Sequence, residues 1–135
     1  MFFGKNKKSI QLTDDELFFV QESIRLLGGR SMRAPDQKVL STLNSMNSSL
    51  SDLSSVISLT GGTLTSKKRS VINDIKNVVS FAVDNFEENL RRTRDVIDIQ
   101  SISGNVQSPL LDKQKRLQGT IDVGRSVLEK LAKLE

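Results

Sequence analysis

Apolar side chains recur at intervals of three and four residues along most of this 135-residue chain. That spacing gathers them on one face of an α-helix, whereas the buried side chains of a strand alternate. The clearest run covers nearly three heptads and consists of Val39, Leu43, Met46, Leu50, Leu53 and Ile57. The β-branched residues, which favour strands, also fall at helical spacing. The pattern therefore predicts an all-α fold.

Four helices are expected, with approximate bounds 14–27, 35–59, 66–99 and 109–134. Thr13 and Glu16 form a capping box at the start of the first helix, and Gly28-Gly29 is expected to stop it. Pro35 suits the first turn of the second helix, and Gly61-Gly62 ends it. Thr65 or Ser66 is the expected cap of the third helix, and Ser108 that of the fourth.

Short connections between these helices favour antiparallel neighbours, so we expect an up-down-up-down bundle over residues 13–135. Residues 1–12 are expected to form a basic, flexible tail. The third helix would be roughly 50 Å long and the first about 20 Å. The third helix must therefore break, overhang the others or pack on something else. Gly124 lies on the apolar stripe of the fourth helix, which suggests that another helix approaches closely there.

The composition argues against most catalytic chemistry. The chain has no cysteine and no histidine, so it lacks thiolate metal sites, a Ser-His-Asp triad and the Glu-x-x-His pairs of di-iron bundles. It also has no glycine-rich phosphate-binding motif. The densest carboxylate cluster, Asp84, Glu87 and Glu88, could hold a hard cation, but pairing of the two glutamates with Arg91 and Arg92 explains it better. No catalytic residue, cofactor or metal is expected, and the chain is not expected to be an enzyme.

The net charge of +4 comes largely from one place, because Lys5, Lys7 and Lys8 supply three of the four charges. Phe2 and Phe3 precede them, and aromatic insertion combined with basic attraction could hold the chain on an anionic membrane. The alternative is a flexible start or a Phe pair packed on the bundle end. No run of 18 apolar residues is present, so we expect a cytoplasmic protein, peripheral to a membrane if these five residues bind one.

A second basic cluster, Lys67, Lys68 and Arg69, falls at the start of the third helix, where the helix dipole disfavours positive charge. The cluster could dock on phosphate groups or on an acidic partner, which makes nucleic acid an alternative ligand. The other interpretation is a solvated helix end.

The second helix is rich in serine, with eight serines and a single charge between residues 41 and 58. Water-exposed helices usually carry Lys and Glu, so small polar faces suggest cover by a neighbouring helix, a second copy or a partner. The candidate contacts are Ser45, Ser48, Ser49 and Ser55. An ordinary exposed serine-rich face is the alternative.

These observations together favour a non-enzymatic helical-bundle protein that acts through protein–protein interaction, as an adaptor, assembly factor or inhibitor. Its partner would be another protein or a second copy, and no small-molecule substrate is expected. The alternatives are a nucleic-acid-associated bundle that uses Lys67, Lys68 and Arg69, and a peripheral membrane protein anchored by Phe2 and Phe3.

Overall fold

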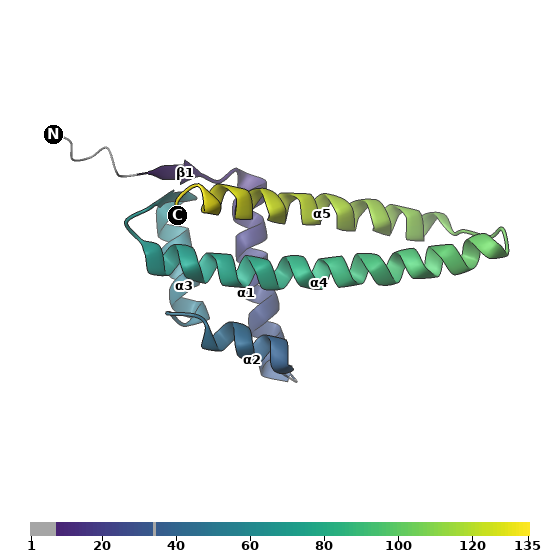
Figure 1. Cartoon of the computed structure of the whole chain (residues 1–135), viewed down its shortest axis with the longest axis horizontal. Helices are drawn as coiled ribbons and strands as arrows, with labels where there is room; N and C mark the ends of the chain where they lie inside the picture. Colours follow the sequence, from purple (N-terminus) through teal and green to yellow (C-terminus); the bar gives the residue numbers. More distant parts are fainter. Residues whose placement is uncertain (1–7, 34) are drawn as a thin grey trace.

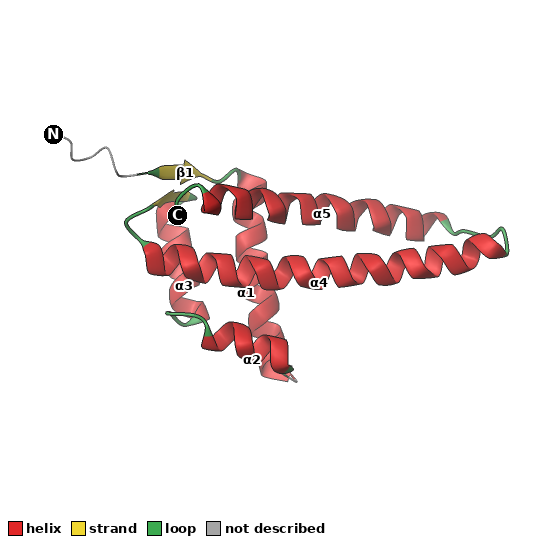
Figure 2. Cartoon of the chain, viewed as in Figure 1, coloured by secondary structure: helices red, strands yellow, loops and turns green. Residues whose placement is uncertain are grey.

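The computed structural model describes residues 8–33 and 35–135, and most of them lie in helices (Figures 1 and 2). The helices are α1 (Asp14–Arg33), α2 (Gln37–Asn44), α3 (Leu50–Thr60), α4 (Arg69–Ile102) and α5 (Ser108–Ala132). Two three-residue strands, β1 (Ser9–Gln11) and β2 (Thr63–Thr65), pair as an antiparallel sheet. The prediction of an all-α fold is confirmed, with five helices in place of four.

The long hairpin of α4 and α5 is the frame of the molecule, and α1, α2 and α3 gather around one end of it (Figure 1). α1 crosses the hairpin rather than lying parallel to it, so the simple up-down-up-down arrangement is not what the fold adopts (Figure 1). One core joins all of these elements. Its fully buried side chains include Val20 and Leu27 of α1, Ile75 and Val79 of α4, and Ile121 of α5.

The third predicted helix is continuous and overhangs the others, with α5 running beside it. Arg92 of α4 and Thr120 of α5 line clefts that they share with α1. Beyond them the hairpin extends past α1 as a two-helix projection, which we call the arm and define as residues 94–118 (Figure 1). The N-caps of α4 and α5 are Lys68 and Gln107, not the predicted Thr65 or Ser66 and Ser108, and neither makes a side-chain capping hydrogen bond.

The predicted second helix is wrong as a single unit, because it is divided into α2 and α3 by a turn at residues 45–49. The buried carboxylate of Asp74 on α4 accepts hydrogen bonds from the backbone N–H groups of Asn47 (2.7 Å) and Ser48 (3.0 Å). The Ser49 side chain caps α3 by accepting from the backbone N–H of Asp52. These polar partners stabilise a helix break that the uninterrupted apolar heptads concealed.

The predicted stop at Gly28-Gly29 is also wrong, since α1 continues through both glycines to Arg33. Two helical glycines cost about 1 kcal/mol each, which packing of the helix offsets. The C-terminal part of α1 packs against α2, and Leu27 is fully buried. By contrast, Gly61 and Gly62 have positive φ angles of 61° and 93° and end α3 as predicted.

Part of the stretch expected to be a flexible tail belongs to the fold. β1 pairs with β2 in the register Ser9–Thr65, Ile10–Leu64 and Gln11–Thr63, and the next residue, Leu12, is buried. Three-residue strands give a weak alternation signal, which explains why the sequence pattern did not reveal them.

Candidate functional site

An apolar groove lies in the corner where α1 meets the α4–α5 hairpin. Its position depends on the start of α1, where the predicted capping box is present. The Thr13 N–H donates to Glu16 Oε1 (2.8 Å), and the Glu16 N–H donates to Thr13 Oγ1 (3.2 Å). The cap fixes the first turn of α1 and thereby the directions of the side chains that follow. Phe18 and Phe19 are adjacent in this helix, so their side chains point in different directions.

Phe19 points inward and anchors α1 to the hairpin. It is buried, and its ring centroid lies 6.0 Å from that of Phe86 on α4. It also sits directly over Gly124 of α5. A Cβ atom at Gly124 would come within 2.6 Å of Phe19 Cζ and within 2.6 Å of Val83 Cγ2. The predicted role of Gly124 in close helix approach is therefore confirmed.

Phe18 points outward and remains 62% exposed, an unusual state for a large aromatic side chain. Beside it lies a groove with a volume of about 330 Å³. The groove is lined by Asp15, Phe18, Phe19, Glu22, Phe86, Thr120 and Val123. Its floor is therefore aromatic and aliphatic. Of the two carboxylates at its edge, Glu22 pairs with Arg25, so the negative charge of the edge comes from Asp15.

An ion pair between a buried carboxylate and a partly exposed lysine closes the base of this corner. Glu16 accepts from Lys130 Nζ on α5 (2.5 Å) and from the hydroxyl of Ser126, and Lys130 also donates to the carbonyl of Gln11 (2.9 Å). Burial raises the pKa of Glu16, but the hydrogen bonds from Lys130, Ser126 and Thr13 outweigh it and lower the pKa from 4.5 to about 2. Glu16 is thus an ionised structural clamp between α1 and α5 and is not placed to exchange protons at neutral pH.

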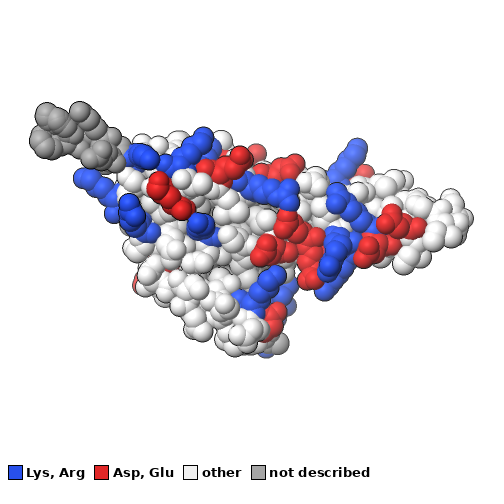
Figure 3. All heavy atoms as spheres, in the orientation of Figure 1, with Lys and Arg blue, Asp and Glu red and all other residues white. Residues whose placement is uncertain are grey.

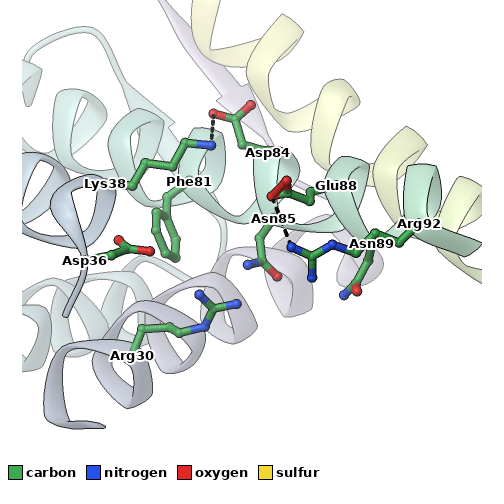
Figure 4. A pocket seen from close by; sticks show the side chains of 9 residues that line it. All are labelled: Arg30, Asp36, Lys38, Phe81, Asp84, Asn85, Glu88, Asn89 and Arg92. Carbon is green, nitrogen blue, oxygen red and sulfur yellow. Dashed lines mark ion pairs between the residues drawn. The ribbon is translucent and has the colours of Figure 1, made fainter. Parts of the chain in front are cut away.

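A polar cleft of about 210 Å³ lies between the end of α1, the start of α2 and the middle of α4 (Figure 4). Three cations and three anions line it, together with Phe81 and two asparagines: Arg30, Lys38, Arg92, Asp36, Asp84, Glu88, Asn85 and Asn89. The charges largely neutralise one another. Lys38 Nζ lies 4.0 Å from Asp84, Arg92 lies 3.9 Å from Glu88, and Asp36 caps α2. The cleft therefore resembles an ion-paired surface more than a reaction centre.

The structure places Glu87 and Glu88 in ion pairs, although not all with the expected partners. Glu88 contacts Arg91 (2.9 Å) and Arg92 (3.9 Å), while Glu87 pairs across the hairpin with Arg125. In the described part of the chain, no three potential ligand residues come together in a way that could hold a metal ion.

The serine candidates lie in two neighbouring parts of the chain. Ser45, Ser48 and Ser49 lie in the turn between α2 and α3, and Ser55 lies on the exposed side of α3. The Ser45 carbonyl accepts from Asn77 Nδ2 (3.3 Å), and Ser48 and Ser49 have the turn-stabilising roles described above. Ser49 therefore has a side-chain role in the turn, whereas Ser45 and Ser48 contribute backbone groups to these contacts.

The basic candidates, in contrast, are partly brought together. Lys67, Lys68 and Arg69 are exposed at the start of α4, and Lys8 joins them because its backbone pairs with Ser66. Figure 3 shows Lys and Arg side chains near this end of the molecule. Phe2, Phe3, Lys5 and Lys7 lie outside the described residues.

Sequence reasoning missed Phe18. The apolar stripe of α1 runs through Leu17, Val20, Ile24 and Leu27, and a second aromatic adjacent to it had no place in that stripe. A pair of adjacent phenylalanines near a helix start is the signal that could have revealed it, because successive helical residues point about 100° apart.

The fold and its groove define an all-α protein built on a helical hairpin, with an open apolar corner. No protein-family model, curated protein or solved structure matches the chain. In the described residues, no helix has the length and apolar character needed to cross a membrane.

Proposed function

We propose that this chain is a cytoplasmic, non-enzymatic interaction protein, and that its groove at Phe18 binds a helical segment of a partner protein. The observation that carries the proposal is the exposed Phe18 ring beside an apolar groove of about 330 Å³. A large exposed aromatic at the edge of a concave apolar surface is typical of binding sites.

The chemistry of the groove indicates what would fit it. Phe19, Phe86 and Val123 offer an apolar floor for one or two aliphatic or aromatic anchors. Asp15 is exposed at the rim, and in the described structure it has no ion-pair partner. An amphipathic helix with an apolar face and a neighbouring Lys or Arg would satisfy both features.

Site-specific photocrosslinking tests the proposal. A photoreactive phenylalanine analogue at Phe18 is expected to form a covalent adduct with a partner in cells. The same analogue at Leu59, which is 87% exposed on α3, serves as the control for general stickiness. Equal adduct formation at both positions, or none at Phe18, would contradict the proposal. An adduct of twice the 15.0 kDa chain mass would identify a second copy as the occupant.

A nucleic-acid role is the second candidate, favoured by the convergence of Lys8 with Lys67, Lys68 and Arg69. Its test is retention of DNA or RNA at low salt by the wild type and by a Lys67→Ser/Lys68→Ser variant. Salt-sensitive retention that the variant loses would support this role, and the absence of any retention at low salt would remove it.

A further inference from the structure

The far end of the arm carries no charge. Between Asp98 and Asp112 lie thirteen consecutive uncharged residues, 99–111, which we call the tip. Three apolar side chains of the tip are exposed: Ile99 by 67%, Ile102 by 89% and Leu111 by 43%. In Figure 3 this end of the molecule is free of Lys, Arg, Asp and Glu, unlike the neighbouring part of the arm. The tip therefore exposes apolar side chains at the end of the molecule farthest from α2 and α3 (Figure 1).

Four backbone N–H groups of the tip are hydrogen-bonded within it. The N–H groups of Ser103 and Asn105 both donate to the Gln100 carbonyl (3.1 Å each), and that of Gly104 donates to the Ser101 carbonyl (3.1 Å). The N–H of Gln107 donates to the side-chain Oε1 of Gln100 (3.2 Å). In a lipid environment an unsatisfied backbone N–H costs several kcal/mol, so internal pairing of these four groups lowers the cost of leaving water. The N–H groups of Val106 and Ser108 have no partner in the described structure, so they would stay at the hydrated level of the headgroups.

The dimensions of the tip also suit a shallow apolar layer. From Asp98 to the end of α4 the helix rises roughly 6–8 Å, which matches the depth of about 5–10 Å to which interfacial elements enter a bilayer. None of the described cavities is lined by residues of the tip. The tip therefore offers no groove to a convex partner, whereas a projecting end can contact a flat surface such as a bilayer.

The charges behind the tip nearly cancel. On α4 and α5 the adjoining charged residues comprise four basic and three acidic side chains: Arg94, Lys113, Lys115, Arg116, Asp95, Asp98 and Asp112. Because the net charge of these residues is only +1, electrostatic attraction to anionic headgroups would contribute little to binding. Attachment through the tip would thus depend on apolar burial and would be insensitive to salt.

We propose that the tip of the arm inserts into the interface of a lipid bilayer, with Ile99, Ile102 and Leu111 as the inserted side chains. This surface is separate from the Phe18 groove and from the basic residues at the start of α4, so it adds a lipid contact to the proposed protein contact. Three aliphatic side chains without a lipid anchor give reversible binding, weaker than that of one myristoyl chain.

The first test uses the absence of cysteine, which allows a single fluorophore to be placed at will. A polarity-sensitive dye on an Asn105→Cys variant of the full chain, which keeps all three proposed apolar contacts, is expected to shift to the blue with phosphatidylcholine vesicles at about 1 mM lipid. The shift should persist when salt is raised from about 0.1 M to about 1 M, where the Debye length falls to about 3 Å. The same dye on Leu59→Cys should not shift.

The second test measures vesicle flotation. An Ile99→Ser/Ile102→Ser variant is expected to lose about tenfold in vesicle partitioning, while Leu59→Ser binds like the wild type. Circular dichroism checks that each variant keeps its helices.

Several outcomes would overturn the proposal. They are no binding by the wild type, equal binding by the tip variant, or binding that salt abolishes and that Lys67→Ser/Lys68→Ser removes. A wild-type mass of twice 15.0 kDa in light scattering that the tip variant lowers to 15.0 kDa would instead assign the tip to a second copy. None of these results depends on Phe18, so the groove proposal is tested separately.

Discussion

Two buried residues, Glu16 on α1 and Gly124 on α5, stabilise the contact between α1 and the α4–α5 hairpin. Glu16 is almost fully buried, yet it is ionised, because Lys130, Ser126 and the Thr13 backbone all donate to it. Gly124 lets Phe19 and Val83 come closer than any side chain there would permit. One contact is electrostatic and the other is steric, and both join α1 to the hairpin.

The Glu16 clamp predicts a pH dependence of stability. Its pKa in the folded protein, about 2, lies below its usual 4.5, so the clamp stabilises the fold fully above pH 4.5. That stabilisation is lost as the pH falls from 4.5 towards 2. Between pH 7 and pH 3 the loss from this group is about 2 kcal/mol of unfolding free energy.

Urea unfolding at both pH values measures this loss. A Glu16→Gln variant should be less stable at pH 7 and should show a fall on acidification that is smaller by about that 2 kcal/mol. Glu129→Gln, a change at a carboxylate with no ion pair in the described structure, is the control. An acid-induced fall of equal size in the wild type and in Glu16→Gln would refute the clamp.

The two glycines of α5 provide a matched pair for the steric contact. Gly124→Ala should destabilise the protein by about 1–2 kcal/mol, since overpacking exceeds the gain in helix propensity. Gly119 has open space around its Cβ position, so Gly119→Ala should stabilise by up to about 1 kcal/mol. Thermal unfolding of both variants gives the comparison, and a stabilised Gly124→Ala protein would show that the helices are not in close contact there.

At the scale of elements, the break between α2 and α3 depends on one buried carboxylate. Asp74 of α4 accepts from two backbone N–H groups of the turn and also from Asn47 Nδ2 (3.1 Å). It replaces the hydrogen bonds that a continuous helix would have supplied.

Removing this carboxylate should therefore cost more than an ordinary surface change. Asp74→Ala is expected to lower the unfolding free energy by about 2–3 kcal/mol because it leaves buried donors unpaired. Asp52→Ala, which removes an exposed carboxylate from the first turn of α3, should cost at most about 0.5–1 kcal/mol. Denaturant titration distinguishes the two, and similar losses would mean that the turn does not need Asp74.

The sequence predicted elements well where local chemistry decides them. The capping box at Thr13, the stop at Gly61-Gly62 and the long third helix all follow from interactions within a few residues. The break at residues 45–49 depends on Asp74, more than 25 positions away in the chain, and no local pattern contains that information. The predicted helix stop at Gly28-Gly29 was wrong for the same reason, since tertiary packing overrode a local stop signal.

The candidate site was harder to predict than the fold. The sequence identified the basic residues at Lys67, Lys68 and Arg69 but did not indicate that Lys8 would join them through β1 and β2. The Phe18 groove needs three helices to meet, and the exposed tip depends on where α1 ends its cover of the hairpin. Both are consequences of how helices cross.

At the scale of the whole molecule, the protein consists of a packed body and an extended arm. The body contains the core and the groove, and the arm holds an uncharged end away from it (Figure 1). This division depends on α4 being one continuous helix of 34 residues, whose outer part runs beside α5 in the arm (Figure 1).

The most direct test of this architecture is a distance between the two ends of α4. Spin labels on Ser70→Cys and Ile102→Cys can be placed uniquely because the chain has no other cysteine. At a rise of 1.5 Å per residue, a continuous helix separates these positions by roughly 50 Å. A narrow distribution near that value, measured by pulsed electron resonance, is the expected result. A main population below roughly 35 Å would mean that the arm folds back onto the body, and it would contradict the account.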